Sequence, residues 1–390
     1  MIIANRRTFF LILVIFVFLQ SRFLKAQSLP SYSQNITVKP FSFPLQLEMR
    51  VPFDPTAIPS DQKSFLIYEL YLTNFNASPI NLRRIELIDA DKKENNPVAI
   101  FDTTQLITMV QPLGRAVSGL AGKLTIAGGQ SAIVFLEVIS DQHVPFPSKI
   151  IHRVVTDNDS LEGATISTHN TILQVLSPPL EGANWIAADG PSNDVDNHHR
   201  RGVIILNGRA VDSRRYAIDW KKVKDGASFS GDPRNVNSYL CYGEKVLAVA
   251  DGLIIRAKDG LPDNIPGHGE AFHPAVPLTF ETLAGNSITI DLGNGHFAYY
   301  MHLKPESLRV KVGDRVYKGQ ILANIGGSGD AREPHLHFEV TTSPQLLLGE
   351  GIPYLIDSYR LNFQKKGYPD IHLHELPTDK EIVDFGKKER

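Results

Sequence analysis

Short apolar or alternating runs separated by turn residues are the feature of this sequence that most constrains its fold. Residues 66–72, 84–89 and 132–138 are rich in aliphatic and aromatic side chains, and Gly, Pro and Asn cluster between them. Helical periodicity is weak along the whole chain. Runs of this length bounded by turn residues are typical of antiparallel strands, so we expect a mostly β protein whose first half is a small β-sandwich.

The same pattern continues in the second half of the chain. Residues 203–206 meet Asn207-Gly208, a strong hairpin signal. Residues 245–250 run into Asp251-Gly252, and 253–255 are expected to return beside them. Residues 287–292 and 297–302 flank Gly293-Asn294-Gly295 in the same way. These runs predict a second domain of antiparallel β-strands.

A chain of 390 residues is too long for one typical domain, and paired prolines within 177–182 provide a plausible boundary. We therefore expect a β-sandwich over 27–180, a second β domain over 181–345 and a C-terminal extension over 346–390. A long segment rich in Pro and Gly, 259–285, is expected to form an insertion in the second domain.

The N-terminus has the composition of a secretory signal peptide. Arg6 and Arg7 precede an apolar run over 9–19, and a small residue, Ala26, follows. A membrane anchor is the competing interpretation, but the apolar core is shorter than the roughly 20 residues that cross a bilayer. We expect cleavage after Ala26, so that residues 1–26 are removed and the mature protein is periplasmic or extracellular, without stable membrane insertion.

Charge and cysteine content exclude several classes of site. The formal net charge of −2 gives no electrostatic basis for nucleic acid as the main partner. The single cysteine, Cys241, excludes an intramolecular disulfide and a zinc site built from several cysteines. Any metal must therefore be held by histidine and carboxylate, and we expect Cys241 to be a buried free thiol without a catalytic role.

Four residues form a candidate site in the second domain. His335 and His337 are two apart on a predicted strand and project to the same face. His302 ends another predicted strand, and Asp219 interrupts an apolar one. Taken singly, each has an ordinary structural interpretation: two exposed histidines, a surface histidine, or a carboxylate paired with a neighbouring arginine. Together, imidazoles and a carboxylate are the ligands of catalytic zinc, which activates water near neutral pH.

The order of motifs resembles that of the lysostaphin-like (LytM-type) zinc metallopeptidases. The matching motifs are Asp219, 243–252, 285–286, 300–303, 312–320, 327–329 and 334–338. The resemblance implies an antiparallel β metallopeptidase with one Zn²⁺ per chain that hydrolyses peptide bonds of bacterial peptidoglycan. It assigns zinc binding to Asp219 and His337, and proton transfer, water orientation or transition-state stabilisation to the catalytic residues His302 and His335.

One position departs from the family pattern. The first zinc ligand is usually a histidine four residues before the aspartate, where this chain has Arg215, which cannot bind a metal. The nearest upstream candidates are His198 and His199, which the 207–208 hairpin can return beside Asp219. We favour His199 as the metal ligand, because similar variants carry one histidine followed by two arginines.

Two further histidines, His268 and His273, are alternatives in the 259–285 insertion, where they are better suited to line a substrate groove. The leading hypothesis is an exported zinc metalloendopeptidase whose sandwich domain positions it or contacts a protein partner. The alternatives are a catalytically inactive protein of the same fold that binds cell wall or regulates amidases, and a binding module with structural histidines.

Overall fold

The computed structural model describes residues 43–92, 96–114, 119, 121–362 and 371–386. All of these residues except Phe43 belong to one compact unit, Pro44–Arg390. The predicted signal peptide, residues 1–26, lies outside the described residues. Among the residues that are described, no helix has the length and apolar character needed to cross a membrane.

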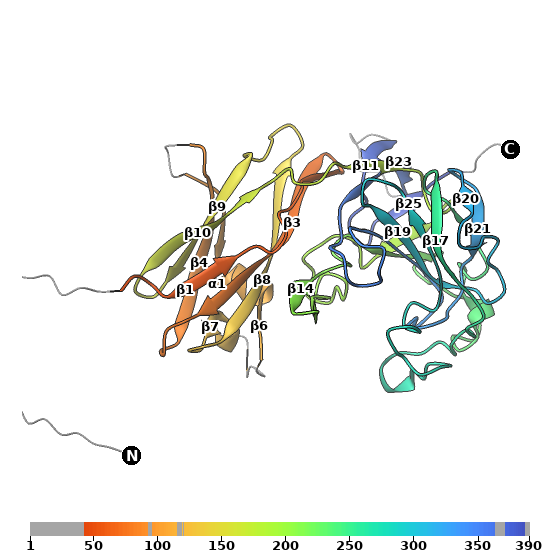
Figure 1. Ribbon diagram of the computed structural model, residues 1–390, viewed down its shortest axis with the longest axis horizontal. Coiled ribbons are helices and arrows are strands. Elements are labelled where there is room, and N and C mark those ends of the chain that lie inside the picture. Colours follow the sequence, from red (N-terminus) through yellow and green to blue (C-terminus); the bar gives the residue numbers. More distant parts are fainter. Residues whose placement is uncertain (1–42, 93–95, 115–118, 120, 363–370, 387–390) are drawn as a thin grey trace, which may run out of the picture. The chain divides into compact units, whose positions relative to one another are not determined.

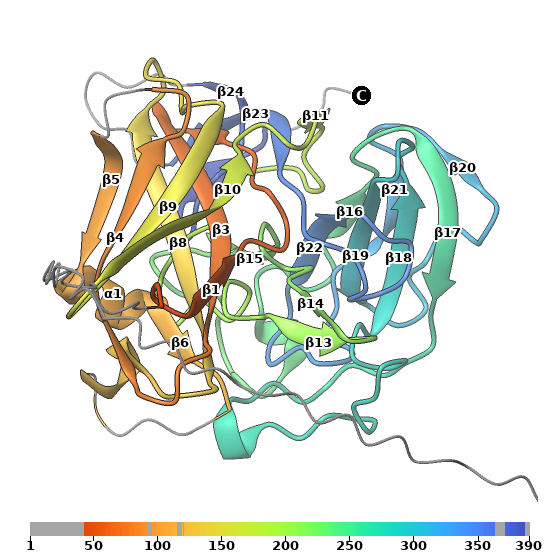
Figure 2. The same cartoon turned by 60° about the vertical axis from the view of Figure 1, so that its left-hand side comes forward.

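The first domain is a sandwich of two five-stranded antiparallel sheets (Figures 1 and 2), as predicted. The first sheet has the order β1-β3-β8-β6, with β2 added to β3; its strands are β1 (Leu47–Arg50), β2 (Ile58–Ser60), β3 (Lys63–Asn74), β6 (Val110–Pro112) and β8 (Ser131–Asp141). The second has the order β10-β9-β4-β5, with β7 added to β4; its strands are β4 (Ile80–Asp89), β5 (Pro97–Asp102), β7 (Thr125–Ile126), β9 (Lys149–Thr156) and β10 (Ser160–Ser167).

A short helix, α1 (Thr103–Met109), lies in this domain and was not predicted. Asp102 accepts hydrogen bonds from the backbone of Thr104 and Gln105, and the Gln105 side chain accepts one from the backbone of Asp102. This capping box stabilises the first turn of a helix that is too short to show a clear apolar period. A 3-10 turn, η1 (Ala121–Leu124), follows it along the chain.

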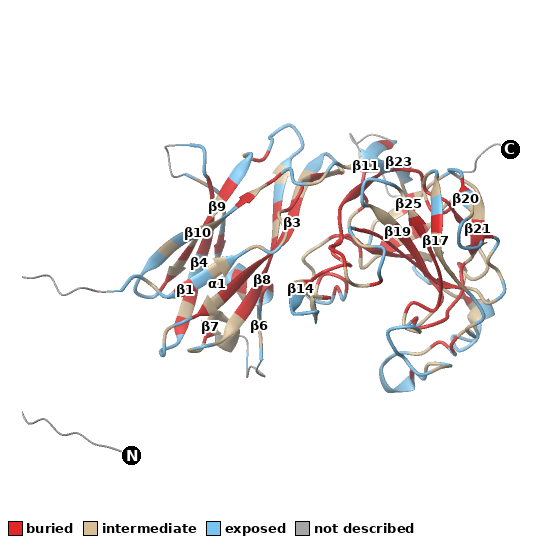
Figure 3. Ribbon diagram, in the orientation of Figure 1, coloured by how far each residue is buried: buried red, intermediate tan, exposed pale blue. Residues whose placement is uncertain are grey.

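Strand β3 is buried on both faces, which Figure 3 shows as a long red stretch. Leu66, Tyr68 and Leu70 pack in the core between the two sandwich sheets. Ile67, on the opposite face, packs in the core of the second domain. The run over 66–72, which is apolar except for Glu69, therefore reflects burial on two sides, whereas a strand with one solvated face alternates apolar and polar residues.

The second domain is built on an eleven-stranded sheet of order β11-β23-β25-β12-β15-β22-β19-β18-β17-β20, with β24 added to β23. Its pairs are antiparallel except β11 with β23. The strands are β11 (Gln174–Leu176), β12 (Trp185–Ala188), β15 (Ile218–Lys222), β17 (Gly252–Lys258), β18 (Asn286–Asp291), β19 (Phe297–Leu303), β20 (Arg315–Val316), β22 (Leu336–Thr341), β23 (Tyr354–Leu361), β24 (His372–Glu375) and β25 (Ile382–Asp384).

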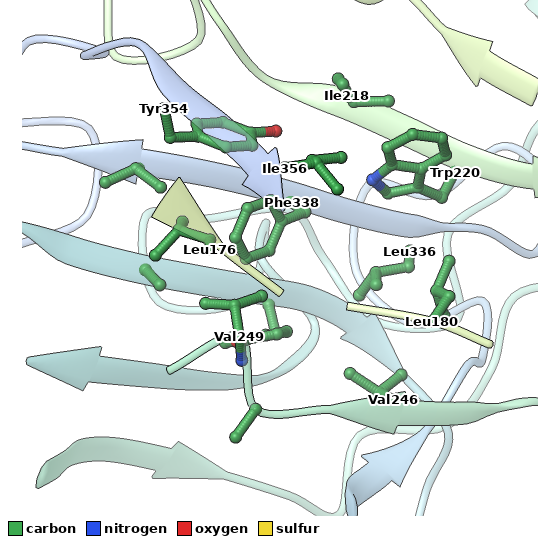
Figure 4. Close-up of a cluster of buried hydrophobic side chains, with 14 of the residues drawn as sticks. Leu176, Leu180, Ile218, Trp220, Val246, Val249, Leu336, Phe338, Tyr354 and Ile356 are labelled. Carbon is green, nitrogen blue, oxygen red and sulfur yellow. The ribbon is translucent and has the colours of Figure 1, made fainter. Parts of the chain in front are cut away.

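The core of this domain lies on one face of the sheet. Trp220, Leu336, Phe338 and Tyr354 are each 1% exposed or less and surround one another with aliphatic side chains (Figure 4). The rings of Phe338 and Tyr354 meet edge to face with their centroids 5.3 Å apart. Because residues alternate along a strand, the neighbours of these apolar residues point to the other face, where the candidate site lies.

Two short strand pairs complete the domain. β13 (Ile204–Leu206) and β14 (Arg209–Val211) form the hairpin predicted at Asn207-Gly208. β16 (Lys245–Leu247) pairs with β21 (Ile321–Asn324). Two 3-10 turns, η2 (Val236–Ser238) and η3 (Gly269–Ala271), lie in its loops.

The expected return of residues 253–255 beside 245–250 is wrong. β17 pairs with β18 and β20, and β16 is not its neighbour. Gly252 lacks the positive φ of a tight hairpin turn; a Cβ there would lie 2.4 Å from Ile290 Cγ2. Glycine at this position therefore permits close packing of the chain against β18. The Asp251-Gly252 dipeptide by itself does not distinguish such a close approach from a hairpin turn.

Candidate metal centre

Asp219 is the residue around which the candidate site is arranged. Its neighbours Ile218 and Trp220 are fully buried in the core, so Asp219 points to the opposite face of β15. The antiparallel register places Asp219 opposite His337 of β22. The two side chains meet there, with His337 Nδ1 2.9 Å from Asp219 Oδ1.

Two further predicted residues lie beside this pair. His335, just before β22, has Nε2 3.4 Å from Asp219 Oδ1. His302, in β19, has its ring centroid 4.8 Å from that of His335 and 6.0 Å from that of His337. The backbone of His302 is left-handed, with φ of 63°, a conformation that is uncommon for a histidine and that is often found at functional sites.

His199 reaches the site from the loop that follows β12. Its side chain is 2% exposed, and its Nε2 lies 3.3 Å from Asp219 Oδ1. β12 pairs with β15 and places Ala188 opposite Asp219, and the carbonyl of the next residue, Asp189, accepts a hydrogen bond of 2.9 Å from His199 Nδ1. The pairing of β12 with β15, and not the 207–208 hairpin, therefore brings His199 to Asp219. Sequence reasoning missed β12, because a strand of four residues is too short to show a clear period.

His198 also lies near Asp219 but is half exposed. Its Nδ1 is 3.0 Å from Asp189 Oδ1 and its Nε2 is 3.7 Å from Asp219 Oδ2. His198, His199 and Asp219 each offer a ligand atom within 4.8 Å of one another. Both members of the predicted pair therefore remain candidates by position, and only His199 is buried.

Backbone carbonyls fix the orientation of three of the imidazoles. The Nδ1 atoms of His199, His302 and His335 lie 2.8 to 2.9 Å from the carbonyls of Asp189, Ser328 and Glu333, respectively. A carbonyl only accepts hydrogen bonds, so each Nδ1 carries a proton, and in the neutral form of the ring the lone pair lies on Nε2. Such partners orient the rings of metal-binding and catalytic histidines.

His337 has the reverse arrangement and lies between two carboxylates. Its Nε2 lies 3.4 Å from Glu339 Oε2, while its Nδ1 faces Asp219. Glu339 is 1% exposed and was missed in the sequence. The signal was present, since residues 335, 337 and 339 share one face of a strand with period two.

Two of the predicted motifs act together on His302. Asn286 donates its backbone N–H to Ser328 Oγ at 2.9 Å. Gly285 has φ of 63°, and a Cβ there would lie 2.4 Å from the Ser328 side chain. Direct contact between these two backbones is what places the Ser328 carbonyl under His302.

Charge and burial oppose one another at the site. Burial would raise the pKa of Asp219, but His335 and His199 hold it well below its usual value. Burial lowers the pKa of His199, and lowers that of His302 well below the ordinary range. Burial alone would lower the pKa of His337, but hydrogen bonds to Asp219 and Glu339 raise it to about 9.

These residues line a cavity of about 610 Å³. Lys221 of β15 and polar or charged side chains from surrounding loops complete its wall; the loop residues are Arg214, His268, Asp330, Arg332 and Glu333. His268 thus lies in the groove as expected, whereas His273 is not among the lining residues. The wall carries both signs of charge, which suits a polar, extended ligand such as a peptide.

Arg215 occupies the usual ligand position but faces away from the cavity. It is buried and donates hydrogen bonds to Glu69 and Glu350, so the alternative of an Asp219–Arg215 ion pair is not realised. Cys241 is also buried, with Sγ 3.1 Å from the carbonyl of Pro334, and burial raises its pKa to about 12.

A family model matches the segment that carries His302, His335 and His337, but not Asp219 or His199. Residues 236–347 match peptidase family M23. This segment is an M23 peptidase domain. Its β fold and the order of its motifs agree with the resemblance to lysostaphin-like enzymes that the sequence indicated.

The named relatives of this chain include two endopeptidases. The chain is 32% identical over 114 residues to the glycyl-glycine endopeptidase ALE-1 of Staphylococcus capitis, covering 29% of this chain and 25% of that protein. It is 30% identical over 127 residues to the peptidoglycan DD-endopeptidase ShyA of Vibrio cholerae, covering 33% and 26%.

Among solved structures, the catalytic domain of the antimicrobial peptidase lysostaphin from Staphylococcus simulans is 26% identical. That match covers 32% of this chain and 86% of the lysostaphin domain, with a TM-score of 0.19. The chain spans about a quarter or less of the length of the curated relatives that it matches.

Proposed function

We propose that this protein is an exported zinc metalloendopeptidase that hydrolyses peptide bonds of bacterial peptidoglycan. The observation that carries the proposal is the convergence of three imidazole nitrogens on one carboxylate oxygen. His199 Nε2, His335 Nε2 and His337 Nδ1 lie 3.3, 3.4 and 2.9 Å from Asp219 Oδ1, in the wall of the cavity.

The residues present fit one zinc ion. His199 Nε2 is buried and makes no hydrogen bond within the described part of the chain, although it carries a free lone pair. With Asp219 and His337 Nδ1 it forms a set of two imidazoles and one carboxylate, which is typical of catalytic zinc. When bound, zinc polarises a carbonyl and lowers the pKa of water to near 7.

In this proposal His335 and His302 handle protons. Each has Nδ1–H committed to a carbonyl, so each Nε2 can accept a proton from the attacking water and return it to the leaving amine. Burial keeps His302 neutral at physiological pH, as an acceptor must be. Once its Nε2 has accepted a proton, such an imidazole can also donate a hydrogen bond to the charge that develops on the substrate oxygen.

The substrate class and location rest on two further observations. The relatives named above are a glycyl-glycine endopeptidase and a peptidoglycan endopeptidase, which supports peptidoglycan cross-links or stem peptides as substrate. The composition of residues 1–26 supports export. Cell-wall peptides in the periplasm or outside the cell are consistent with both.

The proposal is tested by metal analysis and digestion of purified peptidoglycan. We expect about one zinc per chain, which His337→Ala removes, and new peptide ends that His335→Ala abolishes. His273→Ala, outside the cavity, serves as the control and should retain both. Absence of zinc under replete conditions, together with intact peptidoglycan binding, would favour the inactive wall-binding or amidase-regulating alternative.

A further inference from the structure

The outer face of the first sandwich sheet is covered by the chain that carries His199. Tyr71 of β3 and Phe135 of β8 are buried in a cluster with Val203 and Ala210, which follow His199 in sequence. Glu69 lies between Ile67 and Tyr71 on this face of β3 and is only 3% exposed. A buried carboxylate in such a position requires charged or hydrogen-bonding partners.

Two arginines of the second domain are the partners of Glu69. Arg200 donates a hydrogen bond from Nη1 to Glu69 Oε1. Arg215 donates from Nε and Nη2 to Glu69 Oε2, at 3.0 and 2.7 Å. Arg215 also donates to the Glu350 carboxylate at 2.9 Å and to the Gly351 carbonyl at 3.0 Å. Glu69 therefore joins the loop after β12 to the segment before β15.

The loop that carries His199 is bound to the sandwich at further points. Arg200 Nη2 donates to the carbonyls of Tyr68 and Leu136, at 2.6 and 3.2 Å. The guanidinium of Arg201 lies 4.1 Å above the ring of Phe135. Asn193 donates to the Phe135 carbonyl at 2.7 Å.

His199 cannot move independently of these anchors. It precedes Arg200 directly, and adjacent Cα atoms are held about 3.8 Å apart. The turn is tight, since the Arg200 amide donates to Asn197 Oδ1 at 2.9 Å and the Gly202 amide donates to the His199 carbonyl at 2.9 Å. A shift of Arg200 therefore displaces His199 Nε2 relative to Asp219.

The charges explain why Glu69 dominates this contact. Burial would raise the pKa of Glu69, but Arg215 and Arg200 outweigh burial and lower it to about 2. Glu69 is thus ionised, and its loss leaves Arg200, which is 1% exposed, without a carboxylate in hydrogen-bond contact. Removing one member of a buried charge pair is far more disruptive than removing a surface charge.

We propose that the sandwich domain completes the metal centre of the M23 domain, with Glu69 as a positioning residue that holds the ligand His199 through Arg200. This inference rests on the proposed zinc function. It also gives a physical role to Arg215, which stands where the family usually has a zinc ligand. Arg215 anchors the Glu69 carboxylate, and Glu69 in turn orients His199 through Arg200.

The test is the zinc affinity of the full-length protein carrying Glu69→Gln, measured by competition with a chromophoric chelator. We expect affinity to fall about 10- to 100-fold, as for other outer partners of metal ligands. Glu86→Gln is the matched control, because Glu86 is also buried and also pairs with two arginines, Arg84 and Arg153, but within the sandwich. It should keep wild-type affinity.

A role in stability alone would not alter the metal's surroundings. We therefore expect the visible absorption of the cobalt-substituted Glu69→Gln protein to differ from that of wild type, and activity to recover at saturating zinc. If Glu69→Gln does not fold, Arg201→Ala tests the same loop through a less buried contact, with an expected loss of about 3-fold or more. Unchanged affinity in the folded variant overturns the proposal.

Hydrogen exchange separates this inference from the proposed function. Without any metal, Glu69→Gln should increase exchange in the amides of residues 197–202, and Glu86→Gln should not. If wild-type protein binds no zinc, the proposed function fails, while faster exchange in this loop still supports the anchoring. Unchanged exchange in this loop would overturn the anchoring itself.

Discussion

Three of the imidazoles around Asp219 are each oriented by one backbone carbonyl, whereas His337 lies between two carboxylates, and these partners decide which ring nitrogen faces the site. Carbonyls on Nδ1 turn the Nε2 atoms of His199, His302 and His335 inward, and a carboxylate beside Nε2 turns Nδ1 of His337 inward. Loss of one acceptor therefore allows a ring to rotate or change tautomer without removing a ligand.

The two adjacent histidines of the loop after β12 are expected to differ in zinc binding. His199→Ala should weaken zinc affinity by roughly 100-fold or more, because it removes a buried nitrogen from the proposed ligand set. His198→Ala should change it by less than about 3-fold, because this ring is half exposed and already pairs with Asp189. Competition titration measures both, and the reverse order would identify His198 as the ligand.

Glu339 is expected to strengthen zinc binding through its contact with Nε2 of His337. Glu339→Gln preserves size but replaces a charged acceptor, so His337 holds its tautomer less firmly and zinc affinity should fall about 10- to 100-fold. Glu244→Gln, at a partly exposed glutamate paired with Lys222, is the control for loss of one negative charge. Equal affinities in the two variants would show that Glu339 does not act on the metal centre.

Sequence reasoning named residues that the structure brings together, and it missed Glu339 and Glu69; the residues named were His199, Asp219, His302, His335 and His337. The period of two grouped His335 with His337. His302 was selected because it ends a predicted strand, and Asp219 because it interrupts an apolar one. Glu339 lay on the same face but ended an ordinary strand pattern. Glu69 could not be identified as the partner of Arg215, because it is distant in sequence and resembles any polar residue of a strand.

At the level of elements, the sheet of the second domain depends on strands that come from distant parts of the chain. β12 lies between β15 and β25, with Trp185 opposite both Lys222 and Val383. Strands joined by tight turns, such as β18 and β19, were predictable from local sequence. The placement of β25 and the parallel pairing of β11 with β23 were not, since neither depends on a turn.

Packing of β25 should contribute measurably to stability. Val383 is fully buried, so Val383→Ala is expected to lower the free energy of unfolding by about 2 kcal/mol through lost burial and a residual cavity. Val175→Ala, the same change at a residue of β11 that is 45% exposed, should cost less than about 0.5 kcal/mol. Denaturant unfolding compares them, and similar costs would argue against a buried β25.

At the scale of the whole molecule, a buried charge network joins the two domains. Glu69, Glu350, Arg200 and Arg215 balance in charge, and Asp212, 1% exposed, lies beside them with its carboxylate 4.0 Å from Arg200. Burial, and then Glu69, raise the pKa of Asp212 to about 7. Glu69 and Glu350 already neutralise the two arginines, so the Asp212 carboxyl group keeps its proton.

This network predicts a pH dependence of stability. The folded state keeps a proton on Asp212 between its ordinary value of 3.8 and about 7, so this group makes unfolding easier as pH rises through that window. Asp212→Asn lacks the proton equilibrium, and its stability relative to wild type should therefore increase from pH 4 to 7. Groups common to both proteins cancel in this comparison. A constant difference across the window would mean that Asp212 titrates normally.

The position of β25 also limits when this molecule can fold during its synthesis. β12 needs residues 382–384 beside it to complete its hydrogen bonds, and β12 begins the loop that delivers His199. When residues 185–222 have emerged from the ribosome, β12 and β15 are present, but β25, which pairs with the other edge of β12, is not. Until translation reaches residue 384, β12 lacks one of its two neighbouring strands, and the nascent sheet keeps an unpaired edge that can pair with other chains.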